Sequence, residues 1–109
     1  LATSSWRIRG TVQKLQESRL MSITHREFSR SLAPLKRHYM LQEEEQGRAI
    51  FLHSESFSVE IRLGSENAFS IGALSMPRTQ VDFIFHAASV EEKALFLKRF
   101  ELCFRRGGG

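Results

Sequence analysis

Four histidines are the side chains best suited to acid–base or metal chemistry, because imidazole titrates near neutral pH and binds transition metals. They are His25, His38, His53 and His86. No two of them have the H-x-x-x-H spacing of helical metal ligands, and no pair of cysteines accompanies them. His53 and His86 fall on predicted strands, where they can meet across a sheet beside Glu55 or Asp82. A small-molecule or enzymatic site near His53 and His86 is therefore one alternative for the function.

Other reactive residue types have ordinary structural explanations. Cys103 lies on the apolar side of a predicted helix, near its C-terminal end, whereas a reactive thiolate is favoured at a helix N-terminus or beside a cation. The acidic run at 43–45 stands next to a turn, which favours a solvated hairpin end over a cation site. The sequence has no nucleophile elbow, phosphate-binding loop or dinucleotide fingerprint. We expect no catalytic residues, no metal and no cofactor.

Alternating apolar residues predict the strands that would position these side chains. From Phe57 to Leu63 every second residue is apolar and those between are polar, as in a strand with one buried face. Further strands with the same period are predicted at 48–54, 68–76 and 81–86. Strands 57–63 and 68–76 are expected to pair as a hairpin across the turn residues between them. The pattern predicts an antiparallel sheet of four or five strands within 38–86.

The C-terminal segment predicts a long amphipathic helix over 89–106. Ser89 and Glu92 have the spacing of a capping box, in which each side chain bonds the backbone N–H of the other residue. Phe96 and Phe100 recur at helical spacing on one side of the helix. We expect this aromatic stripe to cover one face of the sheet.

Residues 1–37 are predicted to be a basic region with a short helix. Thr24 and Glu27 repeat the capping-box spacing. The helix is expected to end or kink just before Pro34, which would remove a backbone hydrogen bond further inside it. Residues 1–23 fit neither period consistently, so both strand and helix remain open there.

Together these patterns predict one α+β domain over 1–109, a length that suits a single core. The order of strands before one amphipathic helix, with Val81–Phe85 running into Ala88–Glu92, resembles the C-terminal half of pleckstrin-homology-like domains. The resemblance covers less than a third of the chain, and Phe96 or Phe100 stands where those domains usually carry Trp. It implies a module that binds a protein partner or a phosphoinositide.

The sheet face turned away from the C-terminal helix is the surface that we expect to bind a partner. If the alternating residues point to the core, Phe51 and Ile84 point the other way, beside His53 and His86. Four basic residues are expected to form an electrostatic rim: Arg26, Arg30, Lys36 and Arg37. Function is accordingly predicted to be non-catalytic, with the domain binding a protein partner or a second copy of itself through the sheet.

Something must cover the apolar side chains on that face. The N-terminal segment is the simplest cover, through Trp6, Phe28 and Leu32. A partner subunit or an apolar ligand is the functional alternative.

Charge distribution supports a second alternative for the function. The net charge is +4, and residues 1–40 hold eight Lys and Arg against two acids. Such an asymmetry suits nucleic acid or an anionic lipid surface. No apolar run approaches the roughly 18 residues of a membrane span, and a single cysteine favours a reducing compartment, so we expect a cytoplasmic protein.

Overall fold

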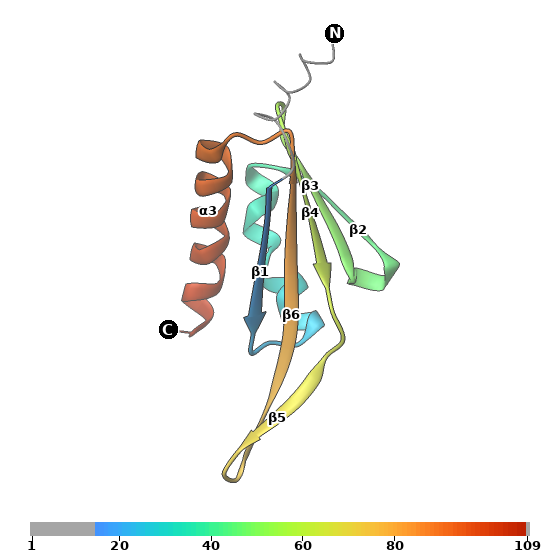
Figure 1. Ribbon diagram of the computed structural model, residues 1–109, viewed down its shortest axis with the longest axis vertical. Helices are drawn as coiled ribbons and strands as arrows, with labels where there is room; N and C mark the ends of the chain where they lie inside the picture. The colour runs from blue at the N-terminus through green and yellow to red at the C-terminus, as the bar shows by residue number, and fades with distance from the viewer. Residues whose placement is uncertain (1–14, 109) are drawn as a thin grey trace, which may run out of the picture.

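The computed structural model of the chain describes residues 15–108 as an antiparallel sheet flanked by helices (Figure 1). Its elements are β1 (Leu15–Met21), α2 (His25–Ser31), the 3-10 helix η2 (Ala33–Arg37), β2 (Met40–Glu44), the 3-10 turn η3 (Glu45–Gly47), β3 (Ala49–His53), β4 (Ser58–Leu63), β5 (Asn67–Ile71), β6 (Leu74–His86) and α3 (Val90–Gly108). The strand order is β1-β6-β4-β3-β2, and β5 pairs with the first part of β6. The predicted α+β fold is confirmed: five strands lie within 38–86, and β1 adds a sixth from the N-terminal region.

An aromatic core fills the space between the sheet and the helices. Phe83 and Phe85 of β6 are fully buried, as are Phe96 and Phe100 of α3 to within 1%. The ring of Phe83 lies 4.9 Å from that of Phe100, edge to face. Phe85 meets Phe96 in the same way at 5.6 Å. Aromatic pairs favour this geometry, so the predicted stripe of α3 faces the sheet.

The start of α3 is held as its sequence predicts. Glu92 N–H donates to the Ser89 hydroxyl at 3.0 Å, and Ser89 N–H donates to the Glu92 carboxylate at 2.9 Å. The Ser56 hydroxyl, between β3 and β4, adds a 2.7 Å bond to the same carboxylate. This contact ties the helix end to the sheet. Within residues 15–108 no helix combines the length and the apolar character needed to cross a bilayer.

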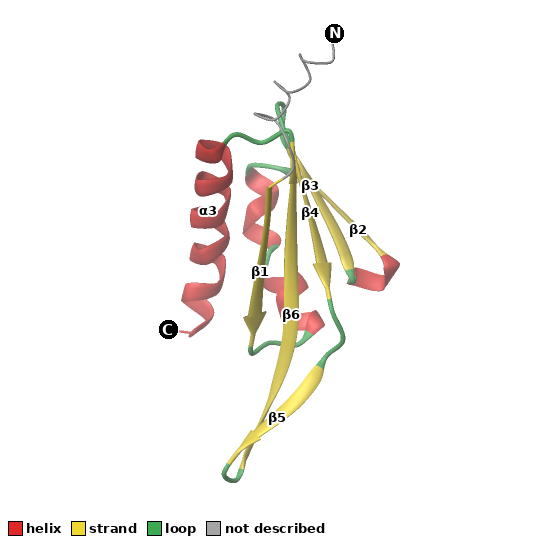
Figure 2. Cartoon of the chain, in the orientation of Figure 1, coloured by secondary structure: helices red, strands yellow, loops and turns green. Residues whose placement is uncertain are grey.

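The second predicted helix also forms, and it packs on the same side of the sheet as α3. Both bonds of the Thr24 capping box are present, and the α-helix ends before Pro34, where η2 takes over. Phe28 is fully buried, with its ring 5.9 Å from that of Phe100 and 5.2 Å from that of Phe104. Figure 2 shows these helices beside the body of the sheet, and none beside β5.

Residues 15–21, where strand and helix had both remained open, form β1 and pair with β6, so the region 1–37 is not helical throughout. The alternation was obscured because charged residues occupy inward positions of β1. Glu17 lies 3.5 Å from Lys93 of α3. Arg19 reaches Glu101 of α3 at 3.2 Å. These ion pairs join β1 to α3. Residues 1–14 lie outside the described part of the chain.

The predicted strand 68–76 and its hairpin with 57–63 are wrong. The chain turns within that segment, at Gly72, which has φ +60°, a value that favours glycine. β5 therefore pairs with the first part of β6, and β4 pairs with the last part of β6. Pro77 does not interrupt β6. Gly64 N–H donates to the Gln80 carbonyl, so the backbone groups of even-numbered β6 residues point toward β4 and β5. The backbone of Pro77, an odd-numbered residue, points to the opposite edge, where β1 has already ended and no described strand needs an N–H donor.

Replacing Phe83 by Ala should lower the free energy of unfolding by about 3–5 kcal/mol, because the change leaves a cavity between β6 and α3. Urea denaturation followed by circular dichroism measures this loss. Leu95→Ala is the matched control, since Leu95 is 47% exposed on α3, and it should cost about 0.5 kcal/mol or less. A similar loss for the two variants would show that the aromatic contacts do not hold the helix to the sheet.

Replacing Glu17 by Gln should destabilise the fold at neutral pH and lose its effect in acid. Burial raises the pKa of Glu17, but the hydrogen bond and charge of Arg19, with Lys93, outweigh it, so the pKa lies below the ordinary 4.5. A lowered folded-state pKa means that the stabilisation is complete above the unfolded-state pKa and is lost as the pH falls through the folded-state value. Urea midpoints of the variant and the wild type should therefore differ at neutral pH and converge below pH 4.5.

Glu44→Gln, a change on an exposed edge-strand residue, is the control for this titration. Its midpoint should follow that of the wild type at every pH. A difference between Glu17→Gln and the wild type that stays constant with pH would contradict a role for the carboxylate charge.

Candidate functional site: the outer sheet face and the β5–β6 arm

The sheet face opposite α2 and α3, here called the outer face, has no described helix over it (Figure 1). Register places its residues in rows across the strands. Phe51, Glu60 and Ile84 form one row, from β3, β4 and β6. Phe51 and Ile84 are half-buried, each beside the Glu60 side chain. The two predicted apolar residues thus share a row but are separated by a carboxylate.

The expected intramolecular cover of this face is wrong for two of its three residues. Phe28 and Leu32 are buried in the core with α3, on the other side of the sheet. Phe28 of α2 and Leu32 at the end of that helix are therefore not available to cover the outer face. Trp6 lies outside the described residues.

His53 and His86 occupy the same row of the outer face but do not meet. Ser58 of β4 lies between them, paired with His53 on one side and His86 on the other. Two strand spacings put their backbones roughly 9–10 Å apart. In residues 15–108 no three His, Cys, Asp or Glu side chains gather as a metal site would require. The structure therefore does not form a site in which the two imidazoles act together.

The middle of the outer face is a network of paired polar groups. Arg62 Nε donates to Glu60 Oε2 at 2.6 Å, and His86 Nε2 lies 3.4 Å from Glu60 Oε1. Burial raises the pKa of Glu60, but these two hydrogen bonds and the accompanying charges lower it by more, so the pKa is below its usual value. The Ser18 hydroxyl donates to Asp82 at 2.7 Å. Because these groups satisfy one another, this region resembles an ordinary hydrated surface.

The four basic residues of the predicted rim are divided between two places on the helix side. Arg26 and Arg30 are exposed on α2. Lys36 and Arg37 end η2, and they line an open groove together with His53 at the β2–β3 edge. Only the second pair therefore reaches the border of the outer face.

Sequence reasoning missed the most apolar exposed feature, the hairpin of β5 with residues 74–78 of β6, here called the arm. Figure 1 shows the arm extending beyond the body of the sheet. Register puts Phe69 opposite Met76 and Ile71 opposite Leu74, so four large apolar side chains share one face. The other face carries small residues and a proline: Ala68, Ser70, Ser75 and Pro77. The arm is thus amphipathic without a core to pack against.

The arm brings exposed apolar side chains together with little charge, whereas Met40, 77% exposed, stands apart in the His53 row of the outer face. Ile71 is 61% exposed and Leu74 is 64% exposed. Arg78 is the one charged residue from 67 to 78, and its guanidinium lies 3.8 Å from the centre of the Phe69 ring. This contact shields the ring at the base of the arm and leaves the tip apolar.

The apolar face of the arm continues the outer face of the sheet. β6 runs without a break from the arm into the sheet, so its even-numbered residues stay on one side from Leu74 to Ile84. Leu20 of β1, 58% exposed, adds a further apolar side chain opposite Gln80, where the arm leaves the sheet. The outer face and the arm form one continuous surface, whose centre holds the polar network and whose tip at Ile71 and Leu74 is apolar.

Comparison of this chain with protein-family models, with curated proteins and with solved structures finds no match. The comparisons therefore add no support to the resemblance of residues 81–92 to pleckstrin-homology-like domains.

Proposed function

We propose that this chain is a non-catalytic interaction domain that binds another polypeptide through the arm, and that in the simplest case this polypeptide is a second copy. The observation that carries the proposal is the uncovered apolar face of the arm, with Ile71 and Leu74 more than half exposed. Contiguous apolar surface of this kind is characteristic of binding sites.

The low intrinsic stability of the arm supports the proposal that it binds a partner. A two-stranded hairpin alone is marginally stable in water, and three strands or a packed face are needed to hold it. The described residues provide neither along 67–71 and 74–78, because β5 pairs with β6 alone. Packing the face with Phe69 and Met76 against a partner would supply the missing burial.

A second copy fits this face through simple symmetry. A twofold interface brings the same patch of both subunits together. If two arms stack face to face in antiparallel orientation, the tip pair Ile71–Leu74 of one copy covers Met76 of the other, beside the Phe69 ring that Arg78 already shields. The two Arg78 side chains then lie at opposite ends of the stack, so like charges are kept apart.

The charges of this surface fit nucleic acid or anionic lipid less well than they fit a polypeptide. Its centre carries Glu60 and Asp82, and the basic residues of α2 lie on the other side of the sheet. Phosphate backbones bind where cations gather, and the arm offers only Arg78.

The double variant Ile71→Ser/Leu74→Ser should abolish self-association without unfolding the domain. The wild type should show a mass that rises with concentration toward that of a dimer in light scattering and sedimentation, and the variant should remain monomeric. Both residues are exposed, so the urea midpoint set by the core should change little.

Val90→Ser/Leu95→Ser is the matched control, because it removes two exposed apolar side chains of α3, 71% and 47% exposed, and leaves the arm unchanged. It should associate as the wild type does. Association lost equally in both double variants would point to general hydrophobicity, and a wild type that is monomeric at every concentration would refute the self-association.

A further inference from the structure

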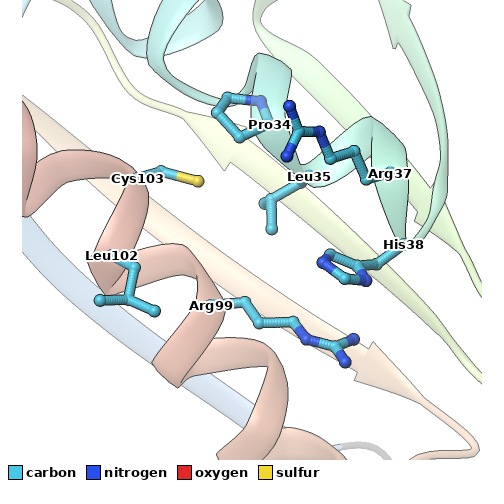
Figure 3. A pocket seen from close by; sticks show the side chains of 7 residues that line it. All are labelled: Pro34, Leu35, Arg37, His38, Arg99, Leu102 and Cys103. Carbon is cyan, nitrogen blue, oxygen red and sulfur yellow. The ribbon is translucent and has the colours of Figure 1, made fainter.

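We infer that a pocket between α3 and η2 binds a small monocarboxylate with a short apolar tail. Arg99, Leu102 and Cys103 line it from α3, and Pro34, Leu35, Arg37 and His38 line it from η2 and its end. Figure 3 shows the two sets of side chains on opposite sides of the opening, with Arg99 extending toward the His38 end. The pocket lies on the helix side of the sheet, away from the arm, so the inference does not depend on the proposed self-association.

The inner part of the pocket is apolar and small. Leu35, 1% exposed, belongs to the core, while Leu102 is 50% exposed at the opening. The volume of about 200 Å³ equals about six or seven water molecules at roughly 30 Å³ each. This space suits a chain of a few carbon atoms, and it is smaller than the roughly 300–1,000 Å³ of drug-sized sites.

The rim of the pocket carries positive charge without a matching carboxylate. No Asp or Glu lines it. Among the described ion pairs, Arg19 and Arg62 are neutralised by carboxylates, whereas Arg37 and Arg99 have no described acidic partner within ion-pair distance. A pair of guanidinium groups beside an apolar pocket therefore favours an anionic ligand.

Arg99 is oriented before any ligand arrives. Its Nη1 donates to the Tyr39 hydroxyl at 3.2 Å, and its guanidinium carbon lies 5.7 Å from the centre of that ring. Tyr39 is itself buried against Phe96, at 5.4 Å between ring centres. Because the core holds Tyr39, the guanidinium is preorganised and less side-chain entropy is lost on binding.

The combination of rim and interior selects the ligand class. A guanidinium recognises the planar carboxylate with two parallel hydrogen bonds, while the apolar interior accepts an alkyl tail. An inorganic anion would leave the half-exposed Leu102 side chain uncovered, and a neutral alcohol would offer the two guanidinium groups no negative charge. A carboxylate with a short tail satisfies both halves of the pocket.

Titration of the intact protein with hexanoate, followed by amide NMR shifts, tests the inference. Saturable shifts should appear at residues 35–38 and 99–103, with a dissociation constant on the order of 1 mM for a ligand this small. Hexan-1-ol, hexylamine and inorganic phosphate serve as probes that lack the carboxylate or the tail, and each should bind at least about tenfold more weakly.

Two variants examine the rim without altering the core. Arg37→Gln changes an exposed side chain and should weaken hexanoate binding about tenfold, as expected for the loss of a hydrogen bond to a charged group. Leu102→Asp places a carboxylate at the opening and should abolish binding. Leu95→Asp is its matched control, two turns earlier on the same helix and similarly exposed, and it should bind hexanoate as the wild type does.

Four results would overturn the inference. Equal affinity for hexan-1-ol would show a purely apolar pocket, and equal affinity for phosphate would show a surface attraction for anions. Absence of saturable shifts in the millimolar range, or shifts outside the two segments, would show that this pocket is not the site. None of these results bears on self-association through the arm, which the arm variants test separately.

Discussion

Phe83 lies where the sheet meets the helices, with its ring 4.9 Å from that of Phe100 and 6.3 Å from that of Phe96. Phe28 of α2 joins the same group through Phe100 at 5.9 Å. The aromatic residues of both helices thus pack on one side of the sheet, where their burial and ring contacts stabilise the fold. Every described helix is therefore drawn to one face, and the other face is left to polar networks and to the arm.

This asymmetry separates two surfaces of different chemistry. The outer face carries paired groups such as Arg62 and Glu60 at its centre, beside the half-buried Phe51 and Ile84. Its exposed large apolar side chains lie at the arm, at Leu20 and at Met40. On the helix side, α2 ends before Pro34 and the 3-10 helix η2 follows it beside α3. The pocket with Arg37 and Arg99 forms between η2 and α3. The proposed polypeptide-binding arm and the proposed anion pocket therefore lie on separate surfaces of the domain.

Local patterns in the sequence predicted the elements whose residues agree with their environment. The alternation of β4 and the capping box at Ser89 belong to this group, because polar and apolar residues there match exposure and burial. β1 could not be recognised, since Glu17 and Arg19 face inward and are compensated by partners on α3, distant in sequence. The arm was missed because Gly72 interrupts a run that otherwise alternates. The pocket joins segments about sixty residues apart, a juxtaposition that no local pattern contains.

The direction of the Pro77 backbone limits how copies of this domain can assemble. An endless β-ribbon needs hydrogen-bonding edges on both sides of each arm, and β5 provides one of them. On the opposite edge, Pro77 has no N–H to donate at the position where an incoming strand would need it. The addition of further strands to the arm is thereby blocked at the β6 edge. The exposed hairpin can therefore bind a partner without forming an endless β-ribbon.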